Sequence, residues 1–414
     1  MSLALYRLML RMGLPFAALQ RWWHLRRSPG PKADWKELFG RYSTRSLSEV
    51  VWLHASSAAS VLPACALAQA LRAERSGVEI LITASTIAGR DTVRRICGEE
   101  TLTAYLPYDL PGAVRRFLAH FRPRLGILVG LELSPTLLEA CQRREIPVVL
   151  ANARLPRRLA RAYARFAAIS RPAFASLAAS CAKDRASLRR LRLLGARPAS
   201  VSGDIAFDVA SDPSQVEEGR ALMAALRGRK ALLLAGTRDG EESQLLDALA
   251  NDDGTLVIIA PRDPDRFDAV AGLAAERGMS VARRSRGEAP HVGRRVFLGD
   301  TGSEMPFYYA VSTVAVIGCS FSPPGGSGVV EACAAGVPAI IGPWMETFDE
   351  ATQAALAAGA AIRVDNAVEA VNVARNLLEL REWSERMALA GMRLCAGHQG
   401  AMARHLEVCR RLLG

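Results

Sequence analysis

Short apolar runs rich in valine, isoleucine and leucine alternate along the chain with longer stretches in which alanine and leucine recur at helical spacing. The runs contain few polar residues, which is typical of strands buried on both faces of a parallel sheet. Strands that alternate with helices predict βαβ units and hence an α/β fold. We expect strands at 50–54, 79–83, 125–129, 147–150, 231–234, 256–260, 296–298, 314–317 and 339–341, with helices such as 62–75 and 111–121 between them.

The series of strands pauses after residue 208 and starts again after residue 225, with a polar stretch and a short helical pattern in the interval. Two such series predict two Rossmann-like domains with a cleft between them, which resembles the GT-B architecture of glycosyltransferases. A dinucleotide-binding pair is disfavoured because no Gly-x-Gly-x-x-Gly turn follows the first strand of either half. The expected parts are a basic segment at 1–45, an N-terminal domain at 46–207, a linker at 208–225, a C-terminal domain at 226–390 and a final helix at 391–414.

The composition narrows the class of protein. The chain has 414 residues, of which 50% are hydrophobic and 23% are charged, as in folded domains rather than disordered segments. It has no run of about eighteen uncharged apolar residues, which excludes a polytopic membrane protein. The eight cysteines show no Cys-x-x-Cys or Cys/His spacing, so we expect a reducing compartment, no metal site and no cofactor.

A net charge of +12 raises the question of an anionic partner. The first 45 residues hold much of this charge, and basic residues alternate there with leucines and with Trp22 and Trp23. Such a mixture is typical of a segment that lies at an anionic bilayer surface, while Arg7 and Arg11 disfavour a spanning helix. An amphipathic helix packed on the protein's own core is the alternative. Because no nucleic-acid-binding motif occurs, we expect an anionic membrane surface as a partner and no nucleic acid.

The sharpest local motif is Pro-Pro-Gly-Gly-Ser-Gly-Val-Val-Glu-Ala at 323–332, after the strand that ends near residue 318. A glycine-rich turn that opens a helix presents backbone N–H groups and a positive helix end to an anion, although a plain strand-to-helix loop would also contain glycines. Glu331 lies in the first helical turn, where its carboxylate can accept hydrogen bonds from two hydroxyls of a ribose. Arg262 follows another strand and suits a phosphate, and an ion pair with a neighbouring aspartate is the alternative.

Four further strings carry a specific resemblance. They are Tyr-Leu-Pro-Tyr-Asp at 105–109, Glu-Leu-Ser-Pro at 132–135, Asn-Ala-Arg-Leu at 152–155 and Gly-Asp-Thr at 299–301. The sequence is similar, over nearly its whole length, to the 3-deoxy-D-manno-octulosonic acid (Kdo) transferase family. The resemblance implies an inverting, metal-independent GT-B enzyme that moves Kdo from a CMP-Kdo donor to a lipid A precursor in lipopolysaccharide biosynthesis. It also implies a location at the cytoplasmic face of the bacterial inner membrane, peripheral or anchored through the N-terminus.

The resemblance assigns the two domains different tasks. The N-terminal domain is expected on the acceptor side, where Glu132 corresponds to an acidic residue that supports the transition state. The C-terminal domain is expected to bind the CMP-sugar through a Pro-Arg pair, the start of a helix and the glycine-rich motif. The substrate-binding candidates are Pro261, Arg262, Gly302, Ser303, Glu304, Gly325, Gly326, Gly328 and Glu331.

The chain departs from the family pattern at several positions, among them residues 60, 206 and 328. The family's catalytic glutamate falls on Ser60, its lysine on Ala206 and an asparagine on Gly328. A serine hydroxyl cannot accept a proton near neutral pH as a carboxylate can, and general-base help is worth ~10²–10⁴ in rate. Two hypotheses follow. Either the chain is an active transferase whose base has moved, to Asp109 or Glu132, or it is a silent or re-specialised paralogue that binds CMP-sugar or lipid as a scaffold or regulator.

Overall fold

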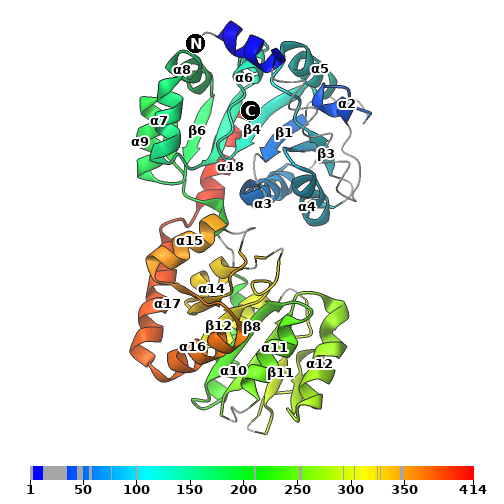
Figure 1. Ribbon diagram of the computed structural model, residues 1–414, viewed down its shortest axis with the longest axis vertical. Helices are drawn as coiled ribbons and strands as arrows, with labels where there is room; N and C mark the ends of the chain where they lie inside the picture. The colour runs from blue at the N-terminus through cyan, green and yellow to red at the C-terminus, as the bar shows by residue number, and fades with distance from the viewer. Residues whose placement is uncertain are drawn as a thin grey trace. The chain divides into compact units, whose positions relative to one another are not determined.

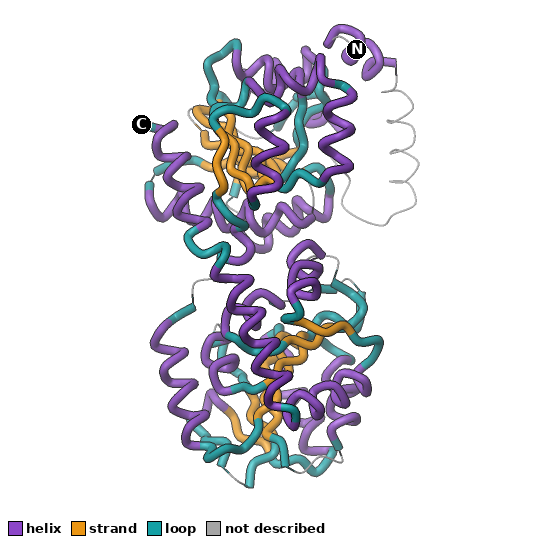
Figure 2. The backbone as a smooth tube through the Cα atoms, turned by 90° about the vertical axis from the view of Figure 1, so that its left-hand side faces the viewer, coloured by secondary structure: helices purple, strands orange, loops and turns teal. Residues whose placement is uncertain are grey.

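The computed structural model describes residues 3–12, 35–43, 50–55, 58–75, 77–98, 101–208, 211–250, 254–291, 293–302, 304–323, 325–326, 328–345 and 349–414. The chain forms two compact units (Figure 1). The first comprises Met1–Ile205 together with Gly400–Gly414, and the second comprises Ala206–Gln399. In each unit a central sheet is enclosed by helices (Figure 2). No helix within these ranges is long and apolar enough to cross a bilayer.

The first unit contains, within its described residues, a seven-stranded parallel sheet in the order β3-β2-β1-β4-β5-β6-β7. The chain winds outward from β1 to one edge, returns to β4, and then winds to the other edge. The strands are β1 Val50–Ala55, β2 Ile80–Ala84, β3 Leu102–Tyr105, β4 Pro123–Val129, β5 Val148–Ala153, β6 Ala179–Ala182 and β7 Ala199–Val201. The helices are α2 Trp35–Leu38, α3 Ala58–Glu74, α4 Ile87–Cys97, α5 Pro111–Phe121, α6 Pro135–Gln142, α7 Arg157–Arg165, α8 Ala167–Ala175, α9 Arg185–Leu193 and α18 Ala401–Leu413.

The surroundings of strand β1 explain why most of its residues are apolar. Successive side chains of a strand point to opposite faces, and here both faces are covered by helices. Trp52 packs with α5 on one face, and its ring centroid lies 5.2 Å from that of Phe117. Leu53 packs on the other face with side chains of α3 and α18. The expected helix at 111–121 is therefore confirmed, and its apolar stripe covers this sheet.

The C-terminal end of the chain returns to the first unit. We expected one helix at 391–414, but α17 ends at Ala396 and α18 begins at Ala401. Gly400 has a φ of 73°, a left-handed conformation that separates the two helices. The ring nitrogen Nε2 of His405 in α18 accepts a hydrogen bond from the backbone N–H of Asn152 at 3.0 Å. The Asn-Ala-Arg-Leu string thus helps to hold the terminal helix.

The second unit repeats the architecture. Its described residues form a seven-stranded parallel sheet in the order β10-β11-β9-β8-β12-β13-β14. The strands are β8 Ala231–Thr237, β9 Leu256–Pro261, β10 Val281–Arg283, β11 Val296–Leu298, β12 Val314–Ile317, β13 Ala339–Ile341 and β14 Ala361–Arg363. The helices are α10 Pro213–Ala225, α11 Glu241–Leu249, α12 Phe267–Glu276, α13 Met305–Val311, α14 Val329–Ala335, α15 Asp349–Ala358, α16 Ala367–Glu379 and α17 Arg381–Ala396.

The segment expected to be a linker is largely helical. Helix α10 occupies 213–225 and belongs to the second unit, where it packs along α13. Its N-terminus is capped by Asp212, whose carboxylate accepts a hydrogen bond from the N–H of Ser214 at 2.9 Å. Gly219 makes the close packing possible, because a Cβ at this position would lie 2.6 Å from the carbonyl oxygen of Phe307. The polar residues at 211–214 are therefore a helix start.

Candidate active site

Two arginines lie at the carboxyl ends of neighbouring strands in the second unit. Arg262 directly follows β9, and its backbone N–H donates to the carbonyl of Thr237 at the end of β8. Its exposed guanidinium places Nη1 3.8 Å from the sulfur of Cys319, which follows β12. Burial raises the pKa of the Cys319 thiol, and the positive charges of Arg262 and Arg238 oppose this shift. The two guanidinium groups therefore form a basic strand edge that suits a phosphate.

The carboxylate of Glu241 fixes this edge. It is buried at the start of α11 and accepts hydrogen bonds from three backbone N–H groups. The donors are Arg238 at 3.0 Å, Cys319 at 2.7 Å and Phe321 at 2.9 Å. The turn after β8 and the loop after β12 are thus tied to one side chain. Glu241 and Arg238 are not among the site residues expected from the sequence, although both lie in the Gly-Thr-Arg-Asp-Gly-Glu string that joins the end of β8 to the start of α11.

The glycine-rich loop is pressed against its neighbours. A Cβ on Gly325 would lie 2.1 Å from the carbonyl oxygen of Trp344, which follows β13. Gly326 has a φ of 128° and donates its N–H to the carbonyl of Cys319 at 2.6 Å. Packing and backbone conformation therefore account for glycine at both positions.

The carboxylate of Glu331 folds back onto the start of its own helix. A Cβ on Gly328 would lie 2.0 Å from Oε2 of Glu331, so the carboxylate occupies the space of a side chain at position 328. Among the residues that the structure describes, no group donates a hydrogen bond to this buried Oε2. Burial raises the pKa of Glu331, opposed only by a hydrogen bond from its own backbone N–H. This acceptor is buried and unsatisfied, next to the phenol of Tyr309, which donates to the carbonyl of Gly328 at 3.3 Å.

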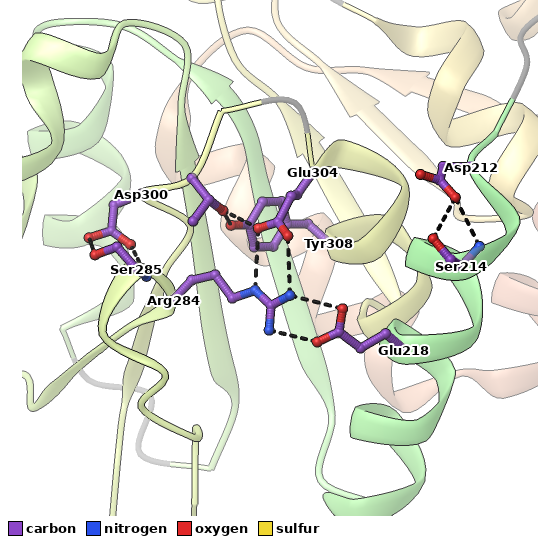
Figure 3. Close-up of polar contacts among 9 residues, drawn as sticks. Asp212, Ser214, Glu218, Arg284, Ser285, Asp300, Glu304 and Tyr308 are labelled. Atoms are coloured by element: carbon purple, nitrogen blue, oxygen red, sulfur yellow. Dashed lines mark hydrogen bonds and ion pairs between the residues drawn. The ribbon is translucent and has the colours of Figure 1, made fainter.

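Glu304 has the opposite surroundings (Figure 3). Its carboxylate lies 3.1 Å from Nη2 of Arg284 and accepts a hydrogen bond from the hydroxyl of Thr301. Arg284 also pairs with Glu218 of α10 at 2.8 Å, and its guanidinium lies 4.2 Å from the ring centroid of Phe307. The hydrogen bond with Arg284 is the main cause that lowers the pKa of Glu304. Glu304 is thus a charged member of an ion-pair network that links α13 to α10.

The other donor-side candidates have simpler places. Pro261 is buried as the last residue of β9, Gly302 is exposed before α13, and Ser303 lies outside the described residues. A cavity of about 690 Å³ lies within the second unit, between α10, α13, α14 and α17. Its lining includes Arg220, Met305, Tyr309, Glu331 and Met392. The structure therefore brings Glu331 to a cavity, whereas Arg262 lies on an exposed strand edge.

Three polar side chains meet at the carboxyl ends of β1, β2 and β4 in the first unit. Oε2 of Glu132 accepts a hydrogen bond from the hydroxyl of Ser85 at 3.2 Å and lies 3.5 Å from Nε2 of His54. The imidazole is buried at 1% exposure, while the Glu132 side chain is 47% exposed. Contact with the His54 imidazole is the main cause that lowers the pKa of Glu132. Glu132 is therefore an ionised carboxylate that is fixed by Ser85 and His54 and is partly exposed to solvent.

Two other sequence candidates have structural places in the first unit. Ser60 is buried in the first turn of α3, at 5% exposure. Asp109 accepts hydrogen bonds from the backbone N–H groups of Thr136 and Leu137, at 2.9 and 2.8 Å, and from the hydroxyl of Tyr6 at 3.1 Å. Burial raises the pKa of Asp109, and the two backbone hydrogen bonds oppose this shift. Asp109 thus holds the start of α6.

Comparison with known proteins places these features in a family. A family model described as 3-deoxy-D-manno-octulosonic-acid transferase (kdotransferase) matches residues 33–209. The chain is 37% identical to the 3-deoxy-D-manno-octulosonic acid transferase of Bordetella pertussis, over 100% of both chains. It belongs to the Kdo transferase family. The Haemophilus influenzae transferase is 28% identical over 94% of this chain and 93% of its own length.

The fold agrees with this Kdo transferase assignment. The crystal structure of Acinetobacter baumannii MurG matches 88% of this chain and 100% of its own, with a TM-score of 0.55 at 14% identity. The expected GT-B fold is therefore confirmed, and the chain is a glycosyltransferase. Ser60, onto which the resemblance is expected to place the family's catalytic glutamate, is a buried serine. Glu132 has a partly exposed carboxylate in the first unit.

Proposed function

We propose that this Kdo transferase uses CMP-Kdo as its donor and a lipid A precursor as its acceptor. The observation that carries the proposal is the pairing, in one chain, of a basic strand edge in the second unit with an open carboxylate in the first. A donor that leaves as a nucleoside monophosphate needs positive charge at its phosphate. An acceptor hydroxyl needs a base.

The donor side is assigned to the second unit. Arg262 is exposed at the end of β9, where its guanidinium can bind the phosphate, with Arg238 as a second positive charge. Glu331 has an unsatisfied carboxylate oxygen that can accept hydrogen bonds from ribose hydroxyls. Pro261, Gly302, Ser303, Glu304 and the glycines at 325, 326 and 328 are proposed to complete the CMP-sugar site. Glu304 would do so through the network that positions α13.

The acceptor side is assigned to the first unit and to a membrane surface. Residues 3–12 form a helix that contacts α6, where Arg7 pairs with Glu139. The helix exposes Leu5, Leu8, Met9 and Met12. An apolar face on a basic segment suits the headgroup region of an anionic bilayer, which would bring the chain to its lipid acceptor. We place it peripherally, at the cytoplasmic face of the bacterial inner membrane.

The proposal is tested by incubating the purified chain with lipid IVA and CMP-Kdo generated in situ. Mass spectrometry of the lipid should show Kdo added to it. A silent or re-specialised paralogue would give CMP binding by calorimetry but no product. Arg262→Ala should weaken CMP binding, with Arg381→Ala at the start of α17 as a matched arginine control. Unchanged CMP affinity in Arg262→Ala would contradict the donor assignment.

A further inference from the structure

We propose that Glu132, backed by the imidazole of His54, is the base that takes the proton from the acceptor hydroxyl in this chain. The inference rests on the proposed Kdo transfer and adds the proton path. Position 60 supplies no base, since Ser60 is a buried hydroxyl within α3. Asp109 is committed to two backbone N–H groups and the Tyr6 hydroxyl.

Glu132 has the geometry of a base. Three adjacent strands converge on it, because β1 carries His54, β2 is followed by Ser85 and β4 leads to Glu132. Ser85 and His54 both contact Oε2, which fixes the carboxylate from one side. With 47% of the side chain exposed, the carboxylate can meet an acceptor hydroxyl directly.

The hydrogen bonds of Thr83 decide which imidazole nitrogen carries the proton. A hydroxyl can donate one hydrogen bond and accept two. The Thr83 hydroxyl donates to the carbonyl of Leu53 at 3.3 Å and accepts from Nε1 of Trp52 at 2.8 Å. Its third contact is Nδ1 of His54 at 2.9 Å. All three contacts are satisfied together only when Nδ1 is the donor.

Nε2 of the neutral imidazole then presents a lone pair toward Glu132. This nitrogen is buried and has no hydrogen-bond partner among the described residues, and Oε2 of Glu132 lies 3.5 Å away. Both Nε2 of His54 and Oε2 of Glu132 can accept a proton, so a proton between them would form a hydrogen bond that joins the two side chains. Contact with His54 lowers the pKa of Glu132, which keeps the carboxylate ionised and able to accept a proton. The nearby phenols of Tyr6 and Tyr163 stay protonated, because burial raises the pKa of each.

In the proposed transfer, each bond that forms is matched by one that breaks. The acceptor oxygen forms a bond to the anomeric carbon of the sugar while the bond from that carbon to the phosphate oxygen breaks, and CMP leaves with the electron pair. The acceptor proton passes to Glu132 and then to Nε2 of His54. The product state holds an imidazolium next to a carboxylate, supported by the Thr83 hydroxyl. Glu132 is the catalytic residue in this step, and His54 is a positioning residue that acts through it.

Steady-state kinetics of matched variants test the base. Glu132→Gln should lower kcat by about 10²–10⁴, the value of general-base help, with little change in KM for either substrate. Formate should restore part of the activity of Glu132→Ala. His54→Gln should lower kcat less than Glu132→Gln and leave KM unchanged. Glu145→Gln, the same change before β5 at the opposite end of the sheet, should behave as wild type.

A second measurement does not depend on turnover. The imidazole ¹⁵N spectrum of histidine-labelled wild type at mildly alkaline pH should show His54 with a proton on Nδ1 and none on Nε2, with His54→Gln identifying its signals. A proton on Nε2 would overturn the proposed path. Product formation with an unaffected Glu132→Gln variant would overturn the base alone. No product from wild type would overturn the proposed function and this step with it.

Discussion

Glu331 and Glu304 are both candidates for donor binding, yet loss of the charge should change stability in opposite directions. The perturbation is the nearly isosteric substitution of each carboxylate by its amide, Glu331→Gln and Glu304→Gln. Glu331 is half-buried and its Oε2 is buried and unsatisfied, whereas Glu304 is paired with Arg284 and Thr301. The unsatisfied carboxylate of Glu331 therefore lowers the stability of the fold unless a bound ligand supplies hydrogen bonds.

The magnitudes follow from these surroundings. An unsatisfied buried polar group costs about 1–3 kcal/mol, and more when it is charged. A neutral amide costs less to bury, so Glu331→Gln should raise the free energy of unfolding by about 1 kcal/mol. Glu304→Gln removes a partly buried charge partner of Arg284 and should lower it by about 1 kcal/mol. For a unit the size of Ala206–Gln399, 1 kcal/mol corresponds to a Tm change of about 2–4 °C.

The pH dependence of stability provides a second test of whether each substitution stabilises or destabilises the protein. The pKa of Glu331 is raised above the ordinary 4.5, so its contribution to stability is present below pH 4.5 and is lost as pH rises through the folded value. The pKa of Glu304 is lowered, so its contribution is present above pH 4.5 and is lost as pH falls through the folded value. Both substitutions should therefore have their largest effects near neutral pH and smaller effects in acid.

Thermal unfolding followed by circular dichroism at neutral and acidic pH measures these changes in stability. Calorimetry measures the affinity of each variant for CMP. Glu331→Gln should unfold at a higher temperature than wild type and bind CMP about tenfold more weakly, equivalent to about 1.4 kcal/mol. Glu304→Gln should unfold at a lower temperature. The reasoning is refuted if both variants lose stability at neutral pH, or if Glu331→Gln gains stability in acid alone.

Three further substitutions test other parts of the structure. Asp109→Ala should lower the free energy of unfolding by about 2 kcal/mol, because two N–H groups of α6 lose a carboxylate acceptor; denaturant titration measures this, and an unchanged midpoint would contradict it. Leu8→Glu removes an exposed apolar side chain from the helix at residues 3–12. It should therefore reduce binding to vesicles that contain phosphatidylglycerol about tenfold or more in a sedimentation assay. Equal binding would exclude this face as a membrane contact. Gly325→Ala should lower Tm and CMP affinity together, because its Cβ meets the carbonyl of Trp344; a change in neither would show that the loop can shift freely.

Central strands and covering helices could be predicted from the sequence, whereas the edges could not. All nine expected strands occur, because buried central strands are continuous apolar runs. The strands that pattern reading missed are short and at or near sheet edges, such as β7 with Ser200 and β10 with Arg283. The packing of the helix at 213–225 and the break within 391–414 could not be predicted, because they depend on contacts distant in sequence. These are Gly219 against α13 and His405 against Asn152.

In the candidate site too, the features that depend on local sequence could be predicted and those that depend on distant contacts could not. The sequence placed Arg262 after a strand and Glu331 in the first turn of a helix, because both positions follow from local patterns. It could not show that Glu241 ties two loops together, since its partners lie about eighty residues away. It could not show the role of His54 either. That role depends on contacts with Thr83 and Glu132, which come from different strands or strand ends.

The central claim is that this chain is a working Kdo transferase although position 60 holds a serine. The most direct measurement is the amount of Kdo-modified lipid formed per molecule of purified wild-type protein, by mass spectrometry with lipid IVA and CMP-Kdo. The account predicts many turnovers, with turnover greatly reduced in Glu132→Gln. Intact CMP binding with no modified lipid would contradict it and would identify the chain as a silent member of the family.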